Sequence, residues 1–261
     1  MLNTLKADFY KLKKSKAFWI CSLLCIAIAV LMVVAMQAGI SRAPSMSDPQ
    51  EAAQFTALAE KASGVFALEQ FLPMGFNLIF IGVFVAIFVS SEFGFGTMKN
   101  ALSRGAERFK VLFSKFIICS GAALVMLFLF IAALLTVGSI VWGFGTATFT
   151  GVLGLVFLQA LIVIAYTALF VFISMTMRGT GGAIATNIIS VTMTSTLLGA
   201  ISMLFGGSFS LSDYWLDWGV SKFAVLSPPS GDIVQGILIA LGWGIASLTV
   251  GTILFKKQDV K

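Results

Sequence analysis

The sequence predicts an all-α protein, a polytopic membrane protein with six transmembrane helices. Three observations predict this class. The 261 residues are 59% hydrophobic and only 11% charged, whereas about 25% of the residues of a soluble domain are charged. Six stretches without Asp, Glu, Lys or Arg are long enough to cross a bilayer, which takes about 20 apolar residues. Their apolar character is continuous, as in spanning helices, and does not alternate as in the strands of a membrane barrel.

The expected elements form a single transmembrane domain over residues 1–261. An amphipathic helix over residues 1–16 comes first, because Leu2, Leu5, Phe9 and Leu12 recur at helical spacing among lysines. We expect this helix to lie along the inner leaflet; a basic flank that only orients the first span is the alternative. The spans are expected at residues 17–36, 72–91, 116–142, 151–177, 181–205 and 233–255. The first span could instead be a signal peptide, but its apolar run exceeds the usual 7–15 residues.

The distribution of positive charge predicts the orientation. Fourteen of the 17 Lys and Arg residues lie in the N-terminal segment, the segment after the second span, the link at Arg178 and the C-terminal tail. The opposite side has only Arg42, Lys61 and Lys222. The positive-inside rule therefore places both termini in the cytoplasm. The net charge of +6 is then a topology signal, and we expect no nucleic acid partner.

Two longer segments, residues 37–71 and 206–232, are expected on the external side. In the first, Asp48-Pro49-Gln50-Glu51 predicts a helix from residue 49 to about residue 63, with Asp48 as N-cap and Glu51 as its capping partner. The second has aromatic residues that favour the headgroup level, namely Tyr214, Trp215, Trp218 and Phe223. The residue types leave the role of both segments open.

The composition excludes several kinds of chemistry. The chain has no His, which removes imidazole bases and His-bound metals, and we expect no catalytic residue and no metal ligand. Cys21, Cys25 and Cys119 lie in or beside apolar runs and are interpreted as reduced, small hydrophobic residues. The dipeptide Gly-Lys of a nucleotide-binding P-loop does not occur, so the chain itself is not expected to be an enzyme. A secondary transporter or a channel stays an alternative, although the spans lack the carboxylates typical of proton or sodium coupling.

The cytoplasmic segment between the second and third spans has signals for a short helix. Thr97 can cap a helix over residues 98–103, and Gly105 can end it. A second helix would begin near Ala106 and lead into the third span. A short helix held below the membrane suits docking onto a cytoplasmic partner, and an ordinary basic loop is the alternative.

The chain resembles the permease subunit of type-2 ABC exporters of the small six-span kind. The basic start Lys14-Ser15-Lys16-Ala17-Phe18-Trp19, the pattern Glu92-Phe93-x-x-Gly96-Thr97-x-Lys99-Asn100-x-Leu102-Ser103-Arg104-Gly105-x-x-Arg108 and the tail Phe255-Lys256-Lys257-x-Asp259 are similar to those permeases. The resemblance implies that the second pattern holds a coupling helix that seats in a groove of the ATP-binding subunit. The implied contact residues are Glu92, Gly96, Thr97, Met98, Lys99, Asn100, Leu102, Ser103, Arg104, Gly105 and Arg108.

The resemblance also implies the partners and the task. Two copies of a cytoplasmic ATP-binding subunit would bind ATP and Mg, and this chain would bind no cofactor. A second permease copy, identical or a close paralogue, would complete the unit in the bacterial cytoplasmic membrane. Relatives of this size, in peptide export and in bacitracin or lantibiotic resistance, suggest an antimicrobial peptide or peptide toxin as cargo, moved by alternating access. The cargo, and whether export, immunity or resistance is the task, stay open.

Polar side chains in uncharged spans are expected to face inward, because lipid offers them no partner. In the resembled family the second and fifth spans line the pathway at the permease dimer interface. The pathway candidates are Asn77, Phe84, Phe88, Asn187, Ser190 and Thr194. The alternative is that these groups hydrogen-bond between helices of one subunit. An uncharged path suits amphipathic or hydrophobic cargo. In the last span, Gly242, Gly244 and Gly251 predict close helix packing.

Overall fold

The structure is a computed structural model, which describes residues 2–45, 48–94, 96, 103, 107–146, 148–177, 179–204 and 210–257. Every element that it describes is helical, which confirms the all-α class. The α-helices are α1 (Leu2–Lys14), α2 (Lys16–Arg42), α3 (Pro49–Lys61), α4 (Gly64–Phe71), α5 (Phe76–Gly94), α7 (Arg108–Trp142), α8 (Phe149–Met177), α9 (Thr180–Thr192), α10 (Thr194–Leu204), α11 (Leu216–Lys222) and α12 (Ser230–Lys257). Three short 3-10 helices are η1 (Ala43–Ser45), η2 (Leu72–Met74) and η3 (Leu211–Tyr214).

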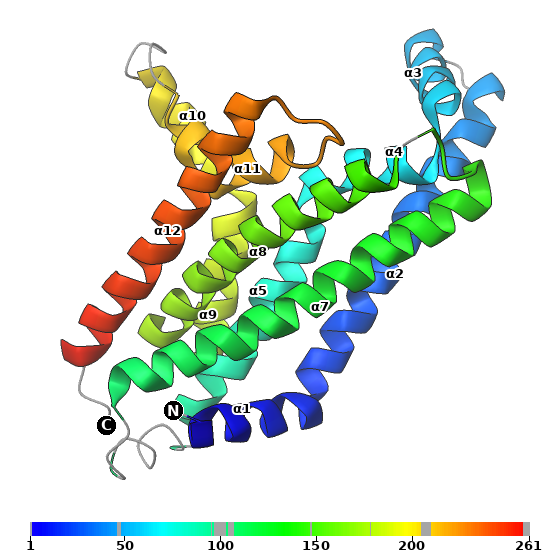
Figure 1. The fold of residues 1–261 in the computed structure, drawn as a ribbon. Coiled ribbons are helices and arrows are strands. Elements are labelled where there is room, and N and C mark those ends of the chain that lie inside the picture. The colour runs from blue at the N-terminus through cyan, green and yellow to red at the C-terminus, as the bar shows by residue number, and fades with distance from the viewer. Residues whose placement is uncertain are drawn as a thin grey trace.

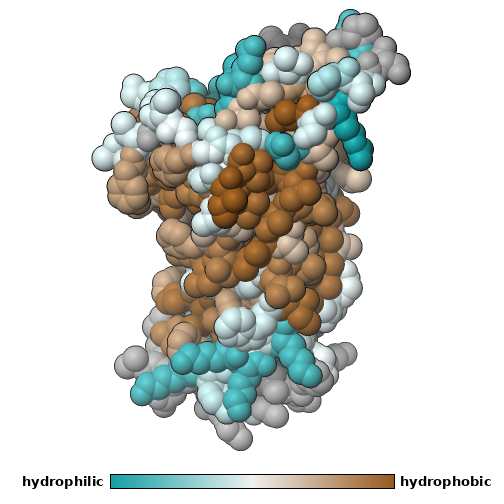
Figure 2. Space-filling model, turned by 90° about the vertical axis from the view of Figure 1, so that its right-hand side faces the viewer, coloured by the Kyte–Doolittle hydropathy of each residue, from teal (hydrophilic) through white to brown (hydrophobic). Residues whose placement is uncertain are grey.

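The structure contains five to six candidate membrane spans within its described residues. By length and apolar composition, α2, α5, α7, α8 and α12 can each cross a membrane. These helices pack side by side, and α1 lies across one end of the bundle, at the end where α12 finishes (Figure 1). The surface is apolar around the middle and hydrophilic at both ends (Figure 2). This distribution is that of a multi-pass membrane protein.

The sixth candidate span is broken, whereas the sequence predicted a continuous helix over residues 181–205. Helices α9 and α10 meet at Met193 with a bend of 56°. Two threonines flank the break. Thr192 donates from its hydroxyl to the Ile188 carbonyl, and Thr194 donates to the Ile189 carbonyl five residues back. Threonine hydroxyls that bond to preceding carbonyls loosen and bend a helix, which accounts for the difference.

Helix α7 begins at Arg108, close to the start near Ala106 that the sequence predicted for the helix leading into the third span, and it therefore includes Lys110 and Lys115. Helix α5 begins at Phe76, four residues after the expected start of the second span. The segment 37–71 contains α4 in addition to the predicted α3. Helix α4 packs closely on α7, because a Cβ added at Gly138 would lie only 2.9 Å from the Cα of Gly64. The predicted N-cap is confirmed, since Asp48 accepts from the backbone amide of Gln50 at 2.8 Å.

Candidate functional site

A cluster of charged side chains joins α1, α5 and α7 at the end of the bundle from which the segment 95–107 leaves α5. We define this ionic cluster as Asp8 and Lys11 of α1, Glu92 of α5, and Ser114 and Lys115 of α7. The Lys115 side chain is only 2% exposed, and its ammonium pairs with the carboxylates of both Asp8 and Glu92. The Lys11 Nζ lies 2.8 Å from Glu92 Oε1, and the Ser114 hydroxyl donates to Asp8 at 2.7 Å. Three helices far apart in sequence are therefore tied by one cluster.

The cluster is balanced in charge, since two ammonium groups face two carboxylates. A buried charge is costly unless it is paired, and removing one partner of such a pair costs about 3–5 kcal/mol. Phe88 of α5 adds a further favourable contact. Lys11 donates to the Phe88 carbonyl at 3.0 Å, and its ammonium lies 4.6 Å from the centre of the Phe88 ring. A cation over an aromatic face is attracted by the ring, so Lys11 attaches α1 to the side of α5.

The C-terminal end of the segment 95–107 is held by a different contact, made by the residue that follows it. Arg108, the first residue of α7, donates to the Phe255 carbonyl near the end of α12 at 2.6 Å, and its guanidinium carbon lies 5.7 Å from the centre of the Phe255 ring. The preceding residue, Glu107, pairs with Lys110 at 2.6 Å. A hydrogen bond from Lys110, together with its charge, lowers the pKa of the Glu107 carboxyl. The beginning of α7 is thus fixed to α12, while its Lys115 is fixed to α1 and α5.

Only part of the predicted coupling set can be placed. Glu92 belongs to the ionic cluster, and Arg108 contacts α12. Gly96 has φ of 66°, the left-handed region that favours glycine, and Ser103 is exposed. The members that lie outside the described residues are Thr97, Met98, Lys99, Asn100, Leu102, Arg104 and Gly105. Arg178, and residues 98–102 of the short helix expected over residues 98–103, lie outside them too.

The pathway candidates lie on α5, α9 and α10. Asn77, Phe84, Phe88, Asn187 and Ser190 are buried, and Thr194 is half-buried at the bend between α9 and α10. Asn187 donates to the Gly82 carbonyl of α5 at 2.9 Å. A Cβ added at Gly82 would lie 3.3 Å from the Asn187 Cβ, so the two helices approach closely here. The structure therefore brings the candidates of α5 and α9 together. They are joined by a hydrogen bond between two helices of one subunit, which is the bond that the alternative interpretation expected.

Sequence reasoning missed most of the ionic cluster. It treated Lys11 and Lys115 as positive charges that set the topology, and it assigned no role to Asp8. A signal was present, because Asp8 is the only acidic residue among the five lysines of residues 1–16. An isolated carboxylate in a basic helix indicates a specific partner. The interpretation of the glycines in the last span was also partly wrong: within the described chain, Gly251 packs closely on Leu112 and Phe172, but a Cβ at Gly242 or Gly244 would meet no atom within 4 Å.

Comparison with known proteins gives one family match. Residues 4–195 match the family described as ABC-2 family transporter protein. Among curated proteins, none matches the chain. The matched region runs from α1 into α10, and it includes every member of the ionic cluster as well as Arg108.

Proposed function

Because the chain belongs to the ABC-2 family of transporter proteins, we propose that it is the permease of an exporter driven by a separate ATP-binding subunit. The observation that carries this proposal is the family match over residues 4–195. Permeases of this family are the membrane component of the transporter and are not the ATPase subunit. A secondary transporter or channel that works without an ATPase, the alternative from the sequence, does not fit this membership. Two cytoplasmic ATP-binding subunits bind ATP and Mg, and two permease copies form the membrane part.

In this proposal the segment from Glu92 to Arg108 contacts the ATP-binding subunit. A contact that transmits movement must be rigidly attached, since a loose segment would absorb the displacement. Glu92 is held by Lys11 and Lys115, and Arg108 is held by the Phe255 carbonyl. A displacement of the segment would therefore move the ends of α1, α5, α7 and α12 together.

The cargo of this exporter is amphipathic or hydrophobic, with a peptide toxin or antimicrobial peptide as the first candidate class. Residues 72–91 and 181–205 have no Asp, Glu, Lys or Arg, which supports this class, because a small ion would lose its hydration there without a compensating partner. Alternating access would open a path beside α5 and the bent pair α9–α10, lined by Asn77, Phe84, Phe88, Asn187, Ser190 and Thr194. Both termini would lie in the cytoplasm of a bacterial cell.

Paired substitutions in the segment test the contact. In the double variant Met98→Asp/Leu102→Asp, two carboxylates replace the apolar groups that we expect to fill a groove of the ATP-binding subunit. The variant should reach the membrane but lose co-purification with that subunit, or lose coupled ATP hydrolysis. Ala53→Asp/Ala57→Asp is the matched control, because these residues are also four apart but lie exposed on α3 at the other end of the bundle. An intact complex with normal transport in the first variant would show that this segment is not the contact.

A further inference from the structure

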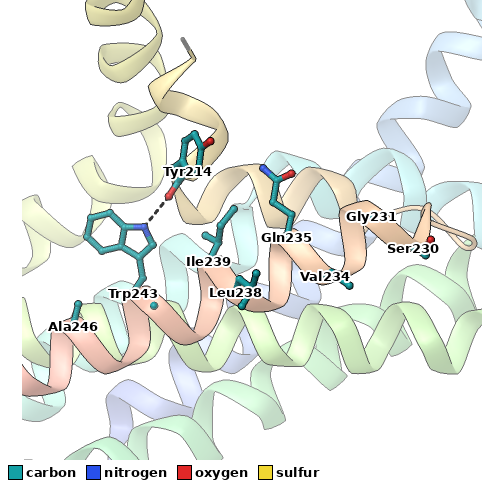
Figure 3. A pocket seen from close by; sticks show the side chains of 10 residues that line it. Tyr214, Ser230, Gly231, Val234, Gln235, Leu238, Ile239, Trp243 and Ala246 are labelled. Atoms are coloured by element: carbon teal, nitrogen blue, oxygen red, sulfur yellow. Dashed lines mark hydrogen bonds between the residues drawn. The ribbon is translucent and has the colours of Figure 1, made fainter.

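Two hollows of the described surface differ in charge. The larger, of about 990 Å³, runs along α12 beside Tyr214, whose carbonyl accepts from the Trp243 indole at 2.8 Å (Figure 3). All of its lining residues are uncharged. The smaller, of about 610 Å³, lies where α3 is followed by α4. Three of its ten lining residues are charged, namely Glu60, Lys61 and Glu69.

We call this smaller hollow the junction pocket, because four segments of the chain form it. They are the end of α3, the first two turns of α4, the link between α7 and α8, and Leu226 before α12. The Gly64 amide donates to the Gly143 carbonyl at 2.8 Å. Gly145 has φ of 96°, and a Cβ added there would lie 2.9 Å from the Ser63 hydroxyl. The walls are thus held together by close contacts between distant segments.

The Glu69 carboxylate is fixed at the wall of the junction pocket. Its Oε1 accepts from the Leu226 amide at 2.9 Å, and both residues line the pocket. Glu69 is half-buried, and the ion pairs within the described residues do not include it. A carboxylate that is partly removed from water is stabilised by an opposite charge nearby. Glu69 therefore presents a negative charge that the described chain does not compensate.

The surroundings of the pocket are also negative. Glu60 adds a second carboxylate at the exposed end of α3, and Lys61 is not within 4 Å of either carboxylate. The pocket thus has two negative charges and one positive charge. In the segments 37–71 and 206–232 the chain has seven acidic and three basic residues, which are Asp48, Glu51, Glu60, Glu69, Asp213, Asp217, Asp232, Arg42, Lys61 and Lys222. Such a field attracts cations.

The positive end of α4 does not offset this charge. A helix N-terminus attracts anions through its free amides, but three of the first amides of α4 already donate elsewhere. Those of Gly64 and Val65 donate to carbonyls of the link between α7 and α8, and that of Phe66 donates to the Ser63 hydroxyl at 3.0 Å. These amides are therefore not available to an anion.

The remaining walls of the pocket are largely apolar. Val65 is buried, and Phe66 and Leu226 are half-buried. The side chains of lysine and arginine have a matching composition, because they place a methylene stem on apolar surface and keep the charged head in a polar one. The volume lies within the range for small organic ligands. A metal ion such as calcium prefers six to eight oxygen ligands, so two carboxylates beside apolar walls suit an organic cation better.

We infer that the junction pocket binds a primary ammonium or guanidinium group on a flexible apolar stem, as in the Lys and Arg side chains of a basic peptide. Glu69 and Glu60 face the charged head, and Val65, Phe66 and Leu226 contact the stem. The use of this pocket to recognise cargo rests on the proposed function and on the predicted orientation, but its binding of the cation rests on neither.

The test is photolabelling of the full-length chain in phosphatidylcholine nanodiscs, which have no net charge. Two N-acetylated tripeptide amides have the same diazirine and differ only in their side chains, which are lysine or ε-acetyllysine. We expect the lysine probe to label the peptides that line the junction pocket about fivefold more strongly, because acetylation removes the charge. Unlabelled lysine peptide and spermidine, compared as competitors, distinguish a basic peptide from a free polyamine as the source of the ammonium group. Equal labelling by both probes would overturn the inference.

Charge variants test the named residues. In Glu69→Gln an amide oxygen can still accept from Leu226, so the shape is kept while the charge is lost. Glu69→Gln and Glu60→Gln should each weaken labelling by the lysine probe about three- to fivefold at low salt and by less at high salt. Lys61→Gln should strengthen it about threefold, because it removes a repelling charge. Glu51→Gln is the matched control, since Glu51 is exposed on α3 and does not line the pocket.

Two further results would contradict the inference. If Glu51→Gln weakened labelling as much as Glu69→Gln, the probe would report only the general surface charge. If Lys61→Gln weakened labelling, the pocket would recognise an anionic group. Labelling needs no ATP, so it reports on the junction pocket even if the proposed contact with the ATP-binding subunit is refuted.

Discussion

Two lysines of α7 are five residues apart and differ sharply in their surroundings. Lys115 is buried between the carboxylates of Asp8 and Glu92, whereas the side chain of Lys110 is 46% exposed and pairs with the exposed Glu107. An exposed ion pair contributes about 0–1 kcal/mol because water screens it. A buried ammonium between two carboxylates, by contrast, leaves unpaired buried charge when it is removed. The same residue type thus has a structural role at one position and a marginal one at the other.

Removal of the buried lysine should therefore be far more harmful than removal of the exposed one. Lys115→Met should lower the free energy of unfolding by about 3–5 kcal/mol, and the control Lys110→Met by less than about 1 kcal/mol. Asp8→Leu combined with Lys115→Met removes one charge of each sign and leaves the Lys11–Glu92 pair, so this double variant should lose less stability than the two single effects added together. Thermal unfolding in detergent measures all of these variants. Purely additive losses would contradict a coupled cluster.

The elements differ in how directly their sequence determines them. Asp48 and Pro49 predict the start of α3, because a carboxylate that caps the first turn and a proline at the first helical position are local signals. The bend at Met193 is less visible, since apolar composition alone favours a straight span through residues 181–205. Threonines tolerate a helix, and their hydroxyls bend it only where they bond to preceding carbonyls, as at Thr194. Helix α4 has a local start signal in Ser63, whose hydroxyl accepts from the Phe66 amide, but the close contact of Gly64 with α7 is not encoded by local signals.

The bend offers a test of the pathway at the level of the element. Thr194→Leu removes the hydroxyl bond to Ile189 and adds bulk at the half-buried break. We expect it to change cargo-stimulated ATP hydrolysis by about 2- to 30-fold, the range for residues along a coupled element, while the protein stays folded. Thr249→Leu is the control, because this threonine is exposed on α12, away from the bend, and bonds to the carbonyl four residues back. Normal stimulation in both variants would show that the bent pair does not line the route.

For the molecule as a whole, hydropathy predicted most of the spans, whereas the orientation that the charges indicate stays a prediction. Five of the six expected spans match single helices, because an apolar run of this length has few alternatives in lipid. The contacts that join the helices were not predictable in the same way. In the sequence, Lys115 is only one more positive charge on the predicted cytoplasmic side. Its partners Asp8 and Glu92 are identified only when the fold brings them beside it. Tertiary partners of this kind are set by packing between distant segments and not by local composition.

The orientation itself is open to a direct measurement. Thr56 on α3 and Lys110 on α7 are both exposed, and they lie in the two segments that we place on opposite sides of the membrane. The three native cysteines are buried, so the natural chain provides a low background. In intact cells, Thr56→Cys should react with a membrane-impermeant thiol reagent, and Lys110→Cys should react only after the membrane is opened. The reason is the charge asymmetry, since 14 of 17 basic residues lie on the Lys110 side. Labelling of Lys110→Cys in intact cells, with Thr56→Cys protected, would invert the topology and with it the placement of the ATP-binding subunit.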